Sequence, residues 1–416
     1  MRQASARGSA WRRSAFVAVV VLGVAAVALT VLRPAADRES PAVAADEEPT
    51  ETARAHEVEA AVPTGPEPPR YFLAWTPGGL PFDFRDRVRT MRGLEATVVF
   101  AGDTAWLTRS LDRNGAVVDE PRPPYAFPID AFAANPVEVA PFLPRQVRGD
   151  VVGALERGEA VLGARSATLR RIGVGGTLEF GDRAMRVGAV VPDELIGWSE
   201  VLVSREAGEP LGIVDDRYVW AFLEGKQRVA PFERTVRSLV PEDEPIRVVA
   251  PGGSRYMRVA SGVHPPIVLK QSFGEFAAAV DPANPAMFEI DPRWTDEHLV
   301  TKRVPLLGKL TCHRVFMAGL LEAMRQVERE GLASSIHSTA GCFDARTVAR
   351  SPTNPPSFHA YGAAVDINAP ENPLGATPAM HPGVVEIFEG LGFTWGGDFL
   401  VPDGMHFEYG VAPKAT

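Results

Sequence analysis

The hydrophobic pattern of the chain begins with one long apolar run near the N-terminus. Residues 14–32 carry no charged side chain and are about long enough to cross a bilayer as a helix. Four arginines precede this run, so the positive-inside tendency predicts a basic cytoplasmic segment 1–13, a transmembrane anchor 14–32 and an extracytoplasmic remainder. A signal peptide cleaved after Ala42-Val43-Ala44 is the alternative. The run is long for a signal core, which favours the anchor, and both interpretations send the rest of the chain across the membrane.

A polar segment follows the apolar run. Residues 33–69 are rich in Pro, Ala and Glu and contain almost no large apolar side chains. Such a segment cannot bury enough surface to offset the entropy lost on ordering. We therefore predict a disordered, extended tether between the membrane and the folded part.

Short apolar runs separated by turn residues predict a β-rich α+β module over residues 70–250. The expected strands cover residues 71–75, 96–100, 104–107, 116–118, 159–162, 177–180, 184–191 and 200–203. Gly102-Asp103 and residues 180–183 are expected to form turns, and residues 144–156 a helix. The module contains no visible catalytic residues, so we expect it to position the chain or to bind a protein partner.

The pattern changes in the C-terminal third. Residues 251–284 contain several prolines and predict a connector, and residues 285–416 predict an α+β domain. A helix is expected over His313–Glu330, where one apolar stripe recurs every three or four residues and Gly331 supplies the stop. A second helix is expected over Pro382–Glu389, and strands over 336–339 and 405–409.

Composition adds limits to this picture. The 416 residues are too many for one ordinary domain, and 45% hydrophobic with 23% charged residues is usual for globular protein. The net charge of −9 and the lack of a basic cluster interleaved with aromatics argue against nucleic-acid binding. The two cysteines, Cys312 and Cys342, lack metal-binding spacing. The two cysteines could form one disulfide, which is allowed outside the cytoplasm, or remain two buried thiols.

Two histidines and a carboxylate are the candidate chemistry. His359 and Asp366 are seven residues apart, and His406 follows Asp366 by forty. One helical face could hold the first two, but Gly362 and the β-branched side chains around Asp366 favour a loop running into a strand. Small residues there would let the backbone pass close to an ion. Two imidazoles and a carboxylate are typical ligands of one open zinc site, whose fourth position holds water.

Asp403, three residues before His406, completes this pattern. From there its carboxylate could take a proton from water and give it to a leaving amine, as a general base does. A single histidine would more often be structural, and we expect that of His313, His337 and His381. The combined pattern of Ser-x-His-x-x-Gly-x-Ala-x-Asp and Asp-x-Met-His-Phe-Glu favours a metal centre.

Residues 291–410 resemble the zinc peptidases of bacterial cell-wall peptides, which include D-alanyl-D-alanine carboxypeptidases and L-alanyl-D-glutamate endopeptidases. The resemblance implies an α+β fold shared with the Hedgehog signalling domain. It also implies that His359, Asp366 and His406 bind zinc, and that Asp403 is the acid/base.

The resemblance implies roles for Arg346 and Ser357, and nearby residues have roles that we expect from their positions. Arg346 would polarise the scissile carbonyl, and Ser357 would hydrogen-bond substrate. Trp395 would shape the pocket wall, by packing or by substrate contact. Glu408 would either orient a ligand imidazole or face solvent. A cysteine pair is not a general feature of this family, but the positions of Cys312 and Cys342 suggest a disulfide that would pin the arginine loop to the preceding helix.

A second, weaker resemblance lies within residues 150–205. Residues 154–163, 172–178 and 185–191 resemble the extracytoplasmic core domain of MacB/FtsX-like transporter permeases by pattern alone. No ATPase motif accompanies them, so transport is not inferred. The glycine cluster 173–176 enters a strand rather than a helix, which indicates a structural turn and not a dinucleotide site.

The sequence thus predicts a membrane-anchored, extracytoplasmic zinc metallopeptidase whose substrates are the peptide stems of peptidoglycan. Either D,D-carboxypeptidase or L,D-endopeptidase action is compatible with it. A non-catalytic zinc module that binds cell wall or a protein is the alternative. The presence of both Asp403 and Arg346 argues against it, because a binder needs neither. A third hypothesis gives the principal role to residues 70–250, as part of a transporter-like complex.

Overall fold

The computed structural model describes residues 71–76, 79–223, 229–242, 244–252 and 264–410. Contacts divide the chain into residues 1–58 and 59–416, and all described residues lie in the second unit. The predicted anchor 14–32 and tether 33–69 therefore lie outside the described residues. Within the described part, no helix combines the length and the apolar character that a membrane crossing requires.

Eleven strands of the described chain form one mixed sheet, in the order β11-β1-β10-β2-β5-β9-β6-β8-β7-β3-β4. Their bounds are β1 Phe72–Trp75, β2 Leu94–Leu107, β3 Arg109–Leu111, β4 Val117–Asp119, β5 Phe127–Ala134, β6 Ala160–Gly163, β7 Thr177–Phe180, β8 Arg183–Val191, β9 Val201–Ser204, β10 Asp216–Leu223 and β11 Arg247–Val249. Most neighbours are antiparallel, but β5 pairs with β9 and β6 with β8 in parallel. The predicted β-rich α+β region therefore contains one mixed sheet.

Short helices accompany this sheet. They are α1 Phe84–Arg89, α2 Pro136–Val139, η1 Ala140–Phe142, α3 Arg145–Glu156, α4 Ala164–Arg170, η2 Asp193–Ile196, α5 Arg205–Gly208, η3 Glu209–Leu211 and α6 Val229–Arg237. The predicted helix 144–156 is confirmed as α3, which buries Val151, Ala154 and Leu155 in the core and has Pro144 at its N-cap. The predicted hairpin turn between β7 and β8 is also confirmed, with Gly181 at φ 65°.

The turn predicted at Gly102-Asp103 is wrong, because β2 runs through it without a break. Gly102 pairs with Phe132 of β5, and a Cβ there would lie 2.8 Å from a ring carbon of Tyr218. The glycine thus makes room for two aromatic rings packed against the strand. Sequence alone does not distinguish this use of glycine from a turn.

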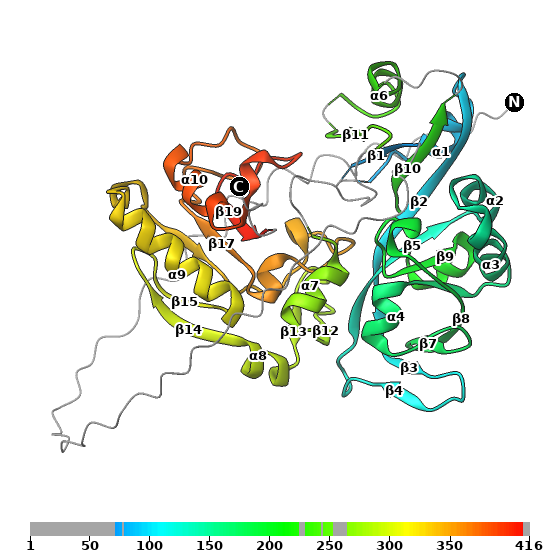
Figure 1. Ribbon diagram of the computed structural model, residues 1–416, viewed down its shortest axis with the longest axis horizontal. Helices are drawn as coiled ribbons and strands as arrows, with labels where there is room; N and C mark the ends of the chain where they lie inside the picture. Colours follow the sequence, from blue (N-terminus) through cyan, green and yellow to red (C-terminus); the bar gives the residue numbers. More distant parts are fainter. Residues whose placement is uncertain (1–70, 77–78, 224–228, 243, 253–263, 411–416) are drawn as a thin grey trace, which may run out of the picture. The chain divides into compact units, whose positions relative to one another are not determined.

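The C-terminal part of the chain contains a four-stranded antiparallel sheet in the order β16-β17-β19-β18. Its strands are β16 Thr339–Gly341, β17 Ala364–Ile367, β18 Phe393–Trp395 and β19 His406–Tyr409, and two hairpins precede it, β12 Ala278–Val280 with β13 Phe288–Ile290 and β14 Leu299–Val304 with β15 Gly308–His313. The helices of this part are α7 Pro266–Phe273, α8 Pro292–His298, α9 Arg314–Arg329, η4 Ala333–Ser335, η5 Val348–Arg350, η6 Phe358–Tyr361, α10 Pro382–Gly390 and η7 Gly396–Asp398. Helices α9 and α10 contact each other, as Figure 1 shows, and share one apolar core with the sheet.

The two helices predicted in this part are confirmed. Helix α9 buries the predicted stripe of Phe316, Leu320, Met324 and Val327, and α10 covers the range expected from Pro382 onward. The strand predicted over 336–339 is wrong, since β16 begins only at Thr339. The backbone N–H groups of His337 and Ser338 donate instead to the side-chain oxygen of Asn368, at 2.7 and 3.2 Å. The Asn368 side chain thus takes the place of the neighbouring strand that the β-branched Ile336 and Thr339 would suggest.

Four buried charged residues join the eleven-stranded sheet to the C-terminal part. Lys270 of α7 donates to Glu200 and to Glu275, both at 2.8 Å, and Arg170 of α4 pairs with the same two carboxylates. Lys270 also donates to the carbonyl oxygen of Pro128 at 2.6 Å. None of the four side chains is more than 9% exposed. We call this set the buried charge cluster; its two positive and two negative charges balance.

His313 makes the stability of the fold sensitive to acid. It caps α9 by accepting from the Val315 N–H, its Nε2 lies 3.2 Å from the Phe273 carbonyl oxygen, and burial lowers its pKa from 6.5 to about 4. The unfolded chain therefore binds a proton more readily, so stability is complete above pH 6.5 and is lost as the pH falls toward 4. Between pH 7.5 and 5 we expect His313 alone to lower the free energy of unfolding by about 2 kcal/mol.

Urea denaturation at these two pH values measures this loss. His313→Gln should reduce the loss relative to the unaltered protein. His381→Gln is the matched control, because His381 caps α10 in the same way, by accepting from Gly383, but is exposed. An equal pH dependence in both variants would contradict the prediction.

Candidate metal centre

The elements of the four-stranded sheet bring three candidate ligands together. His359 lies on η6, Asp366 on β17 and His406 at the start of β19. Asp366 and His406 are direct partners in the β17–β19 ladder, so their side chains project from the same face. Asp366 lies on a strand that follows a loop, as predicted. His359 instead belongs to a single 3₁₀ turn.

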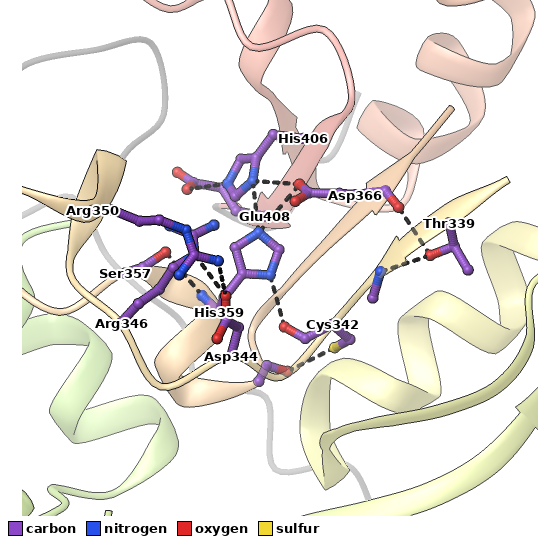
Figure 2. A network of polar contacts seen from close by, with 12 residues as sticks. Thr339, Cys342, Asp344, Arg346, Arg350, Ser357, His359, Asp366, His406 and Glu408 are labelled. Atoms are coloured by element: carbon purple, nitrogen blue, oxygen red, sulfur yellow. Dashed lines mark hydrogen bonds and ion pairs between the residues drawn. The ribbon is translucent and has the colours of Figure 1, made fainter. Parts of the chain in front are cut away.

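The three side chains meet at one point, as Figure 2 shows. His359 Nε2 lies 3.2 Å from both Asp366 Oδ1 and His406 Nδ1, and His406 Nδ1 lies 3.1 Å from Asp366 Oδ1. Ligand atoms that share a tetrahedral zinc at about 2.0–2.1 Å stand about 3.4 Å apart. All three residues are buried, and together they form a group able to hold a metal ion. The donor set and its spacing therefore fit zinc.

Outer hydrogen bonds orient both imidazoles. His359 Nδ1 donates to the carbonyl oxygen of Cys342 at 2.7 Å, and His406 Nε2 donates to Glu408 Oε2 at 3.0 Å. Each ring thereby turns its other nitrogen toward the centre, which is the tautomer that a metal ligand needs. Glu408 is 3% exposed, so the alternative in which it faces solvent is wrong.

Burial and hydrogen bonds act in opposite directions on the protonation of the candidate ligands. Burial opposes protonation of His406, but its hydrogen bonds to Asp366 and Glu408 outweigh burial and raise its pKa to about 10. Burial would raise the pKa of Asp366, but hydrogen bonds from His359 and His406 hold it far below its usual range. The site thus favours one positive charge between two carboxylates. A bound metal ion would supply this charge in place of the proton.

Ser357 and Gly362 shape the turn that carries His359. Ser357 is the N-cap of η6 and accepts from the His359 N–H at 3.3 Å, while Gly362 ends the turn at φ 63°. A Cβ on Gly362 would lie 2.6 Å from the backbone nitrogen of His313, which donates to the Gly362 carbonyl at 2.9 Å. Gly362 therefore allows close packing on the start of α9. That small residues let the backbone pass close to an ion stays a prediction. The substrate contact of Ser357 stays a prediction.

Asp403 lies in the loop that leads into β19. Its backbone N–H donates to Gly396 at 2.8 Å, and its carbonyl accepts from His406 at 3.1 Å. Among the described residues, none offers a hydrogen bond to its buried Oδ1. Burial raises the pKa of this carboxyl, while the charge of His406 lowers it. A fixed carboxylate with one unsatisfied oxygen beside the ligands is what a proton acceptor requires.

Trp395 holds the same loop from the neighbouring strand. Its Nε1 donates to the Gly404 carbonyl at 3.0 Å, and its ring packs against the apolar core. The packing alternative for Trp395 is thus observed. Substrate contact by this ring stays a prediction.

Arg346 is held by a residue that the sequence reasoning missed. Its Nε donates to Asp344 Oδ2 at 2.9 Å, and Arg350 donates to the same oxygen at 2.8 Å. The Asp344 N–H in turn donates to the His359 carbonyl at 3.0 Å, so Figure 2 shows both arginines beside the ligands. The position of Asp344, two residues before Arg346, was the only available signal.

The remaining candidates have structural contacts. Cys312 and Cys342 form a disulfide that links the end of β15 to the segment before Arg346, and the Cys342 carbonyl is the acceptor for His359. His313 and His381 cap helices, and His337 Nδ1 lies 3.1 Å from Glu371 Oε1. None of these three histidines belongs to the metal-binding group found among the described residues.

Comparison with known proteins shows a similarity in the segment that carries the candidate ligands. Residues 350–409 match the family model described as D-alanyl-D-alanine carboxypeptidase. This match contains all three candidate ligands and Asp403, but it begins after Arg346. The segment that carries the candidate ligands is therefore similar to this peptidase family.

Weaker likenesses involve two solved structures, and no curated protein matches the chain. The periplasmic region of MacB from Actinobacillus actinomycetemcomitans is 12% identical, with 44% of this chain and 90% of that chain covered and a TM-score of 0.29. The extracellular domain of the noncanonic ABC-type transporter YknZ from Gram-positive bacteria is 11% identical, with 43% and 99% covered and a TM-score of 0.29. These scores support no conclusion about the fold or activity of this chain.

Glu408 should tune the affinity of the site for zinc. Glu408→Ala removes the acceptor of the His406 Nε2–H and leaves a buried donor unsatisfied, so we expect zinc affinity to fall about 10- to 100-fold. Competition with a chromophoric chelator measures this change. His381→Ala, outside the metal-binding group, should leave the affinity unaltered. An unchanged affinity in Glu408→Ala would show that Glu408 does not orient the ligand.

Proposed function

We propose that this chain is a zinc peptidase that hydrolyses the peptide stems of bacterial peptidoglycan. The observation that carries the proposal is the convergence of His359, Asp366 and His406 inside the segment that matches the carboxypeptidase family. Zinc held there would lower the pKa of water to about 7 and polarise a peptide carbonyl.

Asp403 would move the proton in this reaction. Its unsatisfied carboxylate oxygen accepts a proton from the attacking water and gives it to the amine that leaves when the peptide bond breaks. The hydrogen bonds that fix its backbone to Gly396 and His406 keep the carboxylate in place throughout.

Arg346 would stabilise the negative charge that develops on the carbonyl oxygen. A guanidinium is always charged and presents several donors, which suits it to this task. Asp344 orients the group by accepting from Nε, so little reorganisation accompanies the reaction.

The proposed location supports this substrate. We infer a single-pass membrane protein whose folded part lies outside the cytoplasm, based on the apolar run 14–32 and its basic flank. The disulfide between Cys312 and Cys342 is compatible with an oxidising compartment. The polar segment 33–69 would let the folded part reach wall polymer.

Mass spectrometry of products from defined muropeptides tests the proposal. D,D-carboxypeptidase action removes the terminal D-alanine, whereas L,D-endopeptidase action separates L-alanine from D-glutamate. The zinc-loaded chain should give one of these products, and Asp403→Asn should give far less of it. No product across the panel, despite full zinc loading, would favour the non-catalytic binding module instead.

A further inference from the structure

We propose that Arg217 of the eleven-stranded sheet is a positioning residue for the loop 346–357, which carries Arg346 and Ser357. The inference rests on the proposed function, because the loop matters only if these residues meet substrate. It assigns to the large sheet a part in substrate binding.

The guanidinium of Arg217 holds the tip of this loop. Its Nη1 donates to Asn354 Oδ1 at 2.6 Å, and its Nη2 donates to the hydroxyl and the carbonyl of Thr353, at 2.6 and 3.1 Å. Arg217 is 5% exposed and Asn354 is 7% exposed. These buried, charge-assisted bonds exclude competing water and have the fork geometry that only an arginine offers.

Hydrogen bonds connect the tip of the loop, at Asn354, with its neck, where Arg346 and Ser357 lie. Asn354 Nδ2 donates to the Val348 carbonyl at 3.1 Å, so the contacted residue ties the two sides of the loop together. At the neck the Ser357 N–H donates to the Arg346 carbonyl at 2.9 Å, next to a bridge between Thr347 and Pro356. Both proposed substrate contacts therefore stand at the base of a loop whose far end is fixed from outside.

The backbone of the loop needs this external support. Ala349 and Arg350 have φ values of 52° and 51°, in the left-handed region that side chains other than glycine disfavour. Such conformations are strained and persist only where surrounding contacts hold them. Arg350 also shares Asp344 with Arg346. Relaxation of the tip would therefore disturb the bond that orients Arg346.

The sheet gives Arg217 a fixed base. The buried charge cluster joins the sheet to α7, and a bridge pairs Ala126 with Ala278 of β12. Arg217 therefore contacts the loop from a sheet that is packed against α7 and β12.

Steady-state kinetics on the muropeptide that the chain cleaves tests this role. Arg217→Ala should lower kcat/KM by up to about 100-fold, since small misplacements of positioning groups have effects of this size. Zinc affinity should stay unchanged, because His359, Asp366 and His406 lie outside the loop. Arg217→Lys, which keeps the charge without the fork, should restore part of the loss. Arg109→Ala is the matched control, because Arg109 lies on β3 of the same sheet and pairs with Glu179 at 2.7 Å.

One further variant and a second readout separate the possible failures. Asn354→Ala tests the same contact from the loop side, and its effect should not add to that of Arg217→Ala. Trypsin cleavage after Arg350 reports the order of the tip without any activity, and Arg217→Ala should accelerate it while Arg109→Ala should not. If the unaltered protein is inactive but Arg217→Ala still accelerates cleavage, the proposed function is overturned, whereas the role of Arg217 in ordering the loop is supported. Unchanged cleavage and unchanged kcat/KM in both Arg217→Ala and Asn354→Ala would overturn the inference.

Discussion

Asp403→Asn is expected to lower kcat about 10²- to 10⁴-fold while the protein keeps its zinc, since a positioned general base contributes about that much. Asparagine preserves the shape of the side chain but cannot accept the proton. The three ligands and the backbone bonds from Asp403 to Gly396 and His406 stay intact, so metal binding should not change.

Kinetics on a cleaved muropeptide, with zinc content measured on the same sample, decides this prediction. Asp398→Asn is the matched control, because Asp398 is an exposed carboxylate in the segment just before the same loop. The control should retain nearly full activity. Full activity in Asp403→Asn would refute the assignment of the base, and loss of zinc would show that Asp403 supports the metal instead.

Lys270→Met is expected to lower the free energy of unfolding by about 3–5 kcal/mol, because it breaks a buried ion pair from one side. Methionine fills much of the space but leaves Glu200 and Glu275 with only Arg170 between them. It also leaves the Pro128 carbonyl without its donor. The excess negative charge would be buried in a region where water cannot compensate for it.

Urea denaturation at neutral pH measures this change. Arg329→Met removes one partner of the exposed pair with Glu322 and should cost about 0–1 kcal/mol, as surface pairs do. Adding Glu200→Gln to Lys270→Met should recover part of the loss by restoring the charge balance. A cost below about 1 kcal/mol for Lys270→Met would mean that water reaches the cluster.

The sequence predicts those parts of the fold that depend on local periodicity. Helices α3 and α9 follow from apolar spacing, and their ends follow from proline and glycine. The error at Gly102 has the opposite origin, since the rings of Tyr218 and Phe132 that require the glycine come from other strands. Likewise, the Asn368 side chain that replaces a strand partner at His337 lies far along the chain.

The candidate site likewise contains parts that the local sequence predicts and parts that depend on residues far along the chain. His359, Asp366 and His406 could be predicted because their residue types and spacing indicate metal binding. The acceptors that orient them could not all be predicted, since the Cys342 carbonyl is a backbone atom with no sequence signature. Arg217 lies 137 residues from the loop residue it contacts, and only the folded chain brings the two together.

The direct pairing of Asp366 with His406 has a consequence for how this protein can diverge. Register between β17 and β19 sets the distance between these two ligands, so the length of the intervening loop does not. Insertions or deletions in the exposed stretches of that connection should preserve the centre, whereas β18 pairs with β19 and Trp395 holds the segment that carries Asp403. A single residue inserted within either strand would instead turn one ligand to the opposite face of the sheet. Between these two strands, length variation among descendants of this chain should therefore lie in the exposed stretches of the connection and not within β17 or β19.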